Sequence, residues 1–132
     1  MKYIIMFLIV LGLAFADFIT GYIKAKCADK VSSKALRIGG LHKIAELVIM
    51  GAAIGLTVGL DMLGNYYNDS RLTDLAGMFT ALSVFVYIVV MELISIMENF
   101  AEIVPQAAWA RKILGRLKNY EGGKDDGEQE RH

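Results

Sequence analysis

Three carboxylate side chains interrupt the longest apolar stretches of the sequence. Asp17, Glu46 and Glu92 each lie within two helical turns of a charged residue at one end of their stretch. A carboxylate inside a membrane is costly and usually faces protein or water. Because a helix rises about 1.5 Å per residue, the three acids fall at a similar depth. The spacing therefore predicts a polar layer inside the membrane.

Two interpretations of this layer stay open. The layer either lines a water-filled path, or holds subunits together until a trigger breaks the contacts. Alternatively, the acids are structural: they reach the interface or pair locally with Lys24 and Lys43. Asp17 and Glu92 are the stronger functional candidates, because Glu46 is the acid nearest the interface.

Catalytic and cofactor-binding patterns are absent from the sequence. It contains no Ser/His/Asp or Cys/His arrangement, no phosphate-binding loop and no basic patch interleaved with aromatic residues. Cys27 is the single cysteine, and neither Cys27 nor His42 has neighbouring residues at metal-ligand spacing. We therefore predict a protein that is not an enzyme, needs no cofactor or metal, and binds no nucleic acid.

The elements that position the acids are three long apolar runs. The chain has 132 residues, of which 55% are hydrophobic, and its mean hydropathy is +0.45. Runs at 3–23, 44–63 and 75–97 are each long enough to cross a hydrocarbon core of about 30 Å as a helix. Open strands are excluded, because lipid cannot satisfy their backbone groups. The sequence predicts an all-α integral membrane protein with a transmembrane domain over residues 1–104.

Cations are placed unevenly around these runs. Six lie between the first two runs and six after the third, so that twelve of the fourteen fall on one side of a chain that crosses three times. By the positive-inside rule that side is the cytoplasm, with the N-terminus outside and the C-terminus inside. The motif Ala14-Phe15-Ala16 is similar to a signal-peptide cleavage site. Cleavage there would move six cations outside, so we predict a retained helix.

The segments between the runs are expected to be short. In the basic stretch between the first two runs, Gly39-Gly40 is the clearest break, and Ser32 or Ser33 is placed to cap a short helix before it. The segment 64–74 is rich in Asn, Asp and Gly, which favours a simple turn. Thr73 or Asp74 is then the expected N-cap of the third transmembrane helix.

Beyond the third run, residues 105–118 have the pattern of an amphipathic helix. Pro105 suits its first turn, and apolar residues recur at helical spacing opposite a charged face. The interfacial residues are Trp109, Arg111, Lys112, Arg116 and Lys118. Such a helix either lies on the anionic inner leaflet or packs against partner subunits, and the pattern fits both. Residues 119–132 are predicted to be a polar flexible tail.

Small residues are spaced for close helix packing. Gly51, Gly55 and Gly59 follow one another at intervals of four and so share one face of the second transmembrane helix. Gly12 with Ala16, and Gly77 with Ala81, repeat this spacing more weakly in the other two runs. The spacing predicts close backbone contact, either between subunits or within the chain.

Three blocks of sequence resemble one protein family. Residues 17–25 match the pattern D-x-x-T-G-x-x-K-A, and residues 92–99 match E-x-x-S-I-x-E-N before a proline. The middle block consists of Ser32-Ser33-Lys34 and Gly40-Leu41-His42-Lys43-Ile44. These blocks resemble the toxin secretion/phage lysis holins, the bacteriophage holin and clostridial toxin-release type. The likeness covers roughly residues 10 to 118. The matching positions are Asp17, Thr20, Gly21, Lys24, Ser33, Lys34, Lys43, Glu92, Ser95, Glu98, Asn99 and Pro105.

The resemblance implies a function that the residues alone do not give. A holin of this type accumulates in the bacterial cytoplasmic membrane, forms homo-oligomers and then permeabilises the membrane at a set time. The released cargo is an endolysin or a toxin, which the holin does not necessarily bind. The resemblance also allows an antiholin as a further partner. The alternative is a non-lytic membrane scaffold or a small transporter or channel subunit. A transporter would be expected to show internal repeats, and none is convincing here.

Overall fold

The described part of the chain consists of helices joined by short connections. The computed structural model describes residues 1–76, 80–106 and 108–122. The helices are α1 (Lys2–Cys27), α2 (Ser33–Tyr67), α3 (Ser70–Ala76), α4 (Leu82–Ile103) and α5 (Ala108–Gly122). Within these described ranges, α1, α2 and α4 are long and apolar enough to cross a membrane. The prediction of an all-α protein with three such helices and a further C-terminal helix is confirmed.

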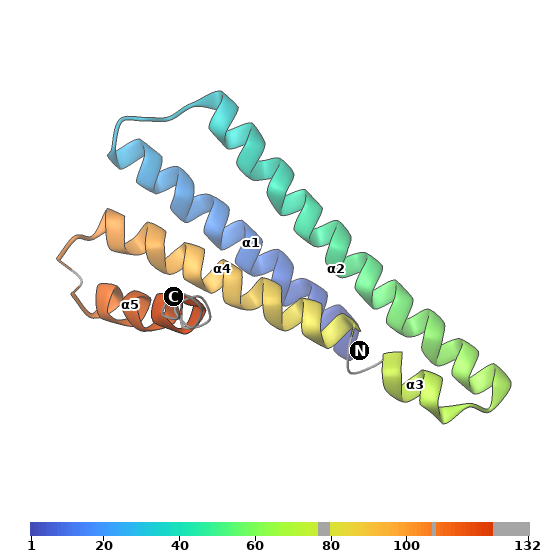
Figure 1. Cartoon of the computed structure of the whole chain (residues 1–132). Helices are drawn as coiled ribbons and strands as arrows, with labels where there is room; N and C mark the ends of the chain where they lie inside the picture. The colour runs from blue at the N-terminus through green and yellow to red at the C-terminus, as the bar shows by residue number, and fades with distance from the viewer. Residues whose placement is uncertain (77–79, 107, 123–132) are drawn as a thin grey trace, which may run out of the picture.

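The three long helices form an elongated bundle. Helices α1 and α4 run side by side in the same direction, and α2 runs antiparallel to both (Figure 1). The closest packing is between α1 and α4, whereas α2 contacts α1 less extensively and α4 only slightly. A small apolar core forms where Val10, Met50 and Ile88 meet. Most other large apolar side chains point outward, as expected for helices that are solvated by lipid.

Helix α2 begins earlier than the sequence predicts. Ser32 accepts a hydrogen bond from Ala35 N–H at the helix N-terminus, and the helix then passes through Gly39-Gly40 without a break. The predicted break is wrong, because glycine costs only about 1 kcal/mol inside a helix and packing can offset this cost. With 35 residues, α2 is about 52 Å long, well beyond a hydrocarbon core of about 30 Å.

The far end of α2 carries a helical corner instead of a simple turn. Asn68 ends α2 in the left-handed conformation, at φ 54°, and the Asp69 N–H donates to Gly64 O over 2.9 Å. Helix α3 then packs back along α2, and this corner projects past the start of α1 (Figure 1). Thr73 and Asp74 therefore lie within α3. Neither of them caps the third long helix, which begins at Leu82.

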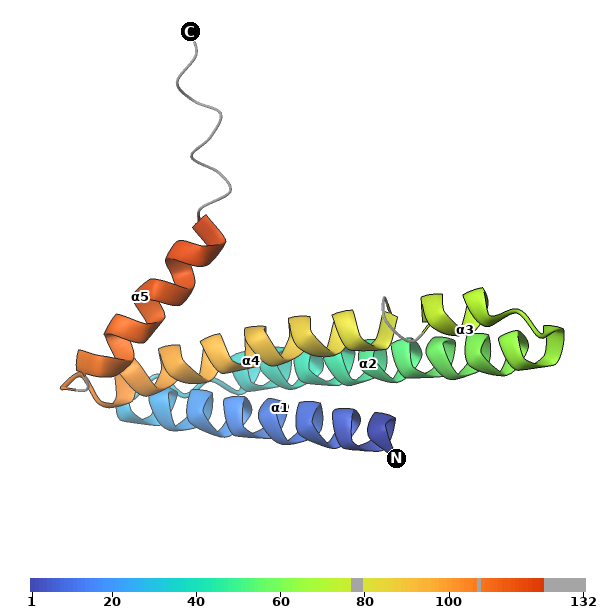
Figure 2. The same cartoon turned by 90° about the horizontal axis from the view of Figure 1, so that it is seen from below.

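Helix α5 follows a turn at Pro105 and leaves the bundle at an angle (Figure 2). It begins at Ala108, so Pro105 precedes its first turn, and it continues to Gly122, past the predicted boundary at 118. The rings of Phe100 and Trp109 lie 5.8 Å apart, which anchors the start of α5 on the end of α4. Two parts of the predictions lie outside the described residues: most of the predicted tail, at 123–132, and Gly77, which was paired with Ala81.

Candidate functional site

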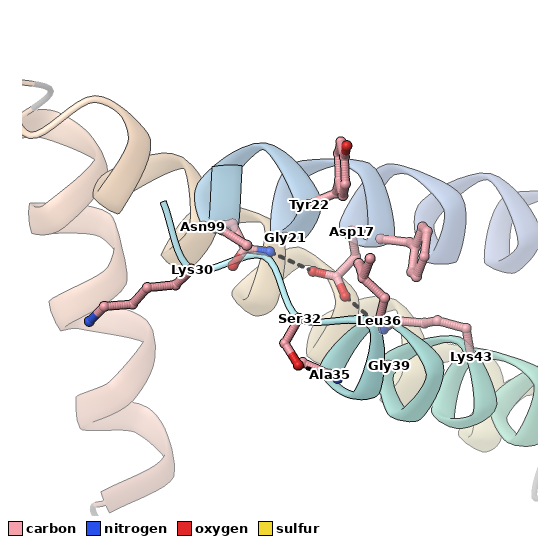
Figure 3. A pocket seen from close by; sticks show the side chains of 12 residues that line it. Asp17, Gly21, Tyr22, Lys30, Ser32, Ala35, Leu36, Gly39, Lys43 and Asn99 are labelled. Carbon is pink, nitrogen blue, oxygen red and sulfur yellow. Dashed lines mark hydrogen bonds and ion pairs between the residues drawn. The ribbon is translucent and has the colours of Figure 1, made fainter. Parts of the chain in front are cut away.

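The three long helices meet at one buried ion-pair cluster. Lys43 Nζ on α2 lies 2.8 Å from Asp17 Oδ2 on α1 and 2.5 Å from Glu92 Oε1 on α4. Figure 3 shows Asp17 and Lys43 reaching toward each other from facing helices. Both acids are buried, and only 19% of the Lys43 side chain is exposed. One ammonium group therefore ties α2 to both of its neighbours.

Glu46 occupies the edge of the same cluster. Its Oε2 atom lies 3.5 Å from Lys43 Nζ, one turn along α2, and 31% of its side chain is exposed. All three acids singled out from the sequence are thus brought to Lys43. They differ in burial, because Asp17 and Glu92 are buried while Glu46 is only half-buried.

A second layer of polar side chains fixes Asp17. Asn99 Nδ2 on α4 donates to Asp17 Oδ1 over 3.1 Å and to Thr20 Oγ1 over 3.2 Å. Thr20 in turn donates to the backbone carbonyl of Asp17 over 3.0 Å. Gly21 lies beside Asn99: an added Cβ there would be 3.6 Å from Asn99 Nδ2. Six of the twelve motif positions, from both ends of the sequence, converge here.

The charges of the cluster do not balance. Three carboxylates surround one ammonium group, so full ionisation leaves an excess of negative charge. Glu92 is 1% exposed, and its Oε2 atom has no hydrogen-bond partner among the described residues. Removing one partner of a buried ion pair is strongly destabilising, because the remaining charge is left uncompensated. The cluster therefore links the three helices, and loss of Lys43 would leave its buried carboxylates without a cation.

The remaining motif residues lie outside the cluster. Lys24 Nζ is 3.6 Å from Glu102 Oε1, which ties the ends of α1 and α4. Lys118 Nζ is 2.8 Å from Glu98 Oε1, which ties α5 to α4. Ser33 and Lys34 are exposed in the first turn of α2, Ser95 is half-buried on α4, and Pro105 is in the turn before α5.

The glycine strip of α2, formed by Gly51, Gly55 and Gly59, faces away from the bundle. A Cβ added at any of the three would meet no described atom within 4 Å. Met50, Ala53 and Thr57, on the opposite face, are the buried residues of this helix segment. The strip therefore takes no part in packing between the described helices. Gly12 on α1 has the same open surroundings within the described structure.

The predicted interfacial residues lie mostly on the surface of α5. Arg111, Lys112 and Arg116 are exposed, and Trp109 is 59% exposed although it touches Phe100. Lys118 is engaged by Glu98. Across the described residues, no three His, Cys, Asp or Glu side chains are placed to hold a metal ion. Cys27 is free and exposed, as is His42.

Local pairing with Lys43 is predicted for the acids, but the central position of Lys43 between acids from three helices is not. In the sequence, Lys43 is one of the cations that predict the orientation, and Asn99 is one of the matching motif positions. Lys43 could have been found from the acids themselves, because a carboxylate inside the membrane requires a cation at the same depth. That signal becomes readable only once α2 is known to begin at Ser33, because Lys43 then lies nearly three turns inside a helix.

A comparison with protein families identifies the type of membrane protein. The model of the bacteriophage holin family matches residues 1–119, a range that includes every residue of the ion-pair cluster. The chain belongs to the bacteriophage holin family. It is a holin-type membrane protein of a family that forms pores and is not enzymatic. No curated protein and no solved structure matched the chain.

We expect Lys43→Met to destabilise this holin by about 3–5 kcal/mol, because the substitution leaves three acids without their cation. Lys34→Met, at an exposed position of the same helix, is the matched control. The measurement is the thermal unfolding midpoint of the purified protein in detergent micelles. Adding Glu92→Gln to Lys43→Met should restore part of the loss. Equal midpoints for Lys43→Met and Lys34→Met would contradict the role of the cluster.

Proposed function

We propose that this holin accumulates in the bacterial cytoplasmic membrane, assembles into homo-oligomers and permeabilises the membrane at a timed moment, which releases an endolysin. The observation that carries the proposal is the buried cluster around Lys43. A lesion that passes water needs polar walls, and a helix that accumulates harmlessly must hide them from lipid. Mutual pairing of Asp17, Lys43 and Glu92 meets both needs: the groups pair with one another, away from lipid, while closed and become wall groups once separated.

The glycine strip of α2 supplies a surface for assembly. In lipid there is no hydrophobic drive between helices, so association depends on close packing, which small residues permit. Gly51, Gly55 and Gly59 lie on the outer face of α2, opposite the side that carries Lys43 and Met50. We infer that α2 of one copy packs on α2 of another through this strip. Each copy would then keep its ion-pair cluster on the inner side until opening.

The orientation follows from charge. With the N-terminus outside and the C-terminus in the cytoplasm, the α1–α2 loop and α5 face the anionic inner leaflet with most of the cations. Arg111, Lys112 and Arg116 are exposed on α5, and so are the apolar Trp109 and Ile113. This combination supports a helix lying at the interface, although the same apolar side chains suit a partner subunit.

The released cargo and the partners belong to the same proposal. A lesion passes a wall-degrading endolysin, or a toxin, without a binding site for it, and an antiholin would act by blocking assembly. We propose no catalytic activity, no cofactor and no nucleic-acid partner for this holin. A non-lytic membrane scaffold is the second candidate function. Dense pairing around Lys43 favours it, because such contacts also suit a purely structural role.

Induced expression of the chain in a bacterium should leave membrane potential and growth unchanged for a lag and then depolarise the cells abruptly. Co-expression of an endolysin without a signal sequence should convert depolarisation into lysis. Glu92→Gln should shift the onset, because it removes a charge that Lys43 pairs with. Asp74→Asn, at an exposed acid of α3 outside the ion-pair cluster, is the matched control and should keep the original onset. A stable potential at high expression would instead support a scaffold.

Gly55→Leu should abolish assembly, because it inserts bulk where two backbones are expected to meet. Chemical crosslinking of membranes should give ladders for the parent chain and monomers for this variant, with permeabilisation lost in parallel. Ala45→Leu enlarges another exposed side chain of α2 outside the strip and should keep the ladder. Ladders that are identical for Gly55→Leu and the parent chain would remove the strip from the assembly interface.

A further inference from the structure

A cavity of about 210 Å³ lies between the second half of α1 and the first half of α2 (Figure 3). Lys30 and Ser32 of the connecting loop stand at one end of it, and Asp17, Lys43 and Asn99 at the other. Along α1 the lining extends from Asp17 to Ala25, a rise of about 12 Å. The cavity thus connects the loop side of the membrane with the ion-pair cluster.

Small residues keep this side of the bundle open. Gly21 and Ala25 on α1 face Ala35 and Gly39 on α2 across the cavity. A Cβ added at Gly39 would touch no described atom within 4 Å. A second hollow of about 280 Å³, with apolar walls, lies on the other flank of Lys43 between the same two helices. At this depth α2 is therefore held to α1 by the Asp17–Lys43 ion pair more than by side-chain packing.

The cavity has the room and the partners that water requires. A water molecule takes about 30 Å³ in the liquid and needs two to four polar partners when enclosed. Asp17, Lys43 and Asn99 offer carboxylate, ammonium and amide groups at the inner end, and Ser32 carries a hydroxyl group near the loop. Several water molecules fit, and each can bridge groups that the protein pairs only in part.

We propose that this cavity is an aqueous vestibule, which admits water and small hydrated ions from the loop side to the ion-pair cluster, and that opening of the holin begins by widening it. The second half of this inference rests on the proposed function. Helix α2 is the one that moves, because α4 stays with α1 through the Asn99–Asp17 hydrogen bond and the Lys24–Glu102 ion pair. Water that enters raises the local dielectric and weakens the attraction between Asp17 and Lys43.

Cysteine accessibility in the full-length chain tests the vestibule before any lesion forms. In a Cys27→Ser background, single cysteines are placed by Gly39→Cys in the cavity and by Ile38→Cys and Leu41→Cys on exposed faces just before and after it. Membrane vesicles that retain a potential are treated with a charged, membrane-impermeant methanethiosulfonate from the loop side. The labelling rate is measured for each position, and the onset of permeabilisation is recorded for each variant in cells.

We expect Gly39→Cys to react roughly tenfold faster than both neighbours, because the reactive thiolate forms in water and not in hydrocarbon. A labelling rate for Gly39→Cys between those of Ile38→Cys and Leu41→Cys would mean that depth in the membrane alone governs access. The same rate is expected if a lipid acyl chain fills the cavity. Either case would overturn the vestibule. Slow labelling of Gly39→Cys in a variant that still permeabilises cells on time refutes the vestibule and leaves the proposed function standing. Fast labelling of Gly39→Cys, together with no permeabilisation by the parent chain, supports the vestibule and refutes the proposed function.

Discussion

Lys43 Nζ stands between carboxylates from two other helices, and the arrangement of the bundle depends on that position. Lipid tails are as apolar as the side chains of α1, α2 and α4, so burial of apolar surface does little to choose among helix arrangements in a membrane. Ion pairs and hydrogen bonds are selective, because their alternative in hydrocarbon is an unpaired charge. The contacts from Lys43 to Asp17 and Glu92 set the depth at which α2 lies against the other two helices.

The three helices are joined by contacts of unequal kind. Helix α4 meets α1 along an extensive packed surface, which the Asn99–Asp17 hydrogen bond and the Lys24–Glu102 ion pair reinforce. Helix α2 has looser contacts, with hollows on both flanks of Lys43. A bundle built this way has one rigid pair and one helix retained mainly by charge. That division suits a protein that must accumulate in a closed form and then rearrange.

The sequence predicted what depends on local composition and could not predict what depends on helix register. Three apolar runs and their acids were readable, because the hydrocarbon thickness sets helix length and charges inside it are rare. A helix capped near Ser32 was predicted, but its continuation into the second apolar run was missed, because Gly39-Gly40 looks like a break although a helix tolerates glycine at a cost of about 1 kcal/mol each. With the second transmembrane helix predicted over 44–63, Lys43 was expected just before the helix as a local partner for the acids. The hydrogen bond from Asn99 to Asp17 could not be predicted either, since the two residues are 82 positions apart in the sequence.

The most direct test of this account is the distance between a spin label on α1 and one on α2, measured in vesicles before and during leakage. Ile23→Cys and Ile38→Cys in a Cys27→Ser background place labels on exposed faces near the loop. Dilution with unlabelled chain confines the signal to pairs within one molecule. Ile23→Cys with Leu93→Cys on α4 gives the reference pair. The account predicts a longer α1–α2 distance in leaking vesicles and an unchanged α1–α4 distance. An α1–α2 distance that is the same in intact and leaking vesicles would contradict it.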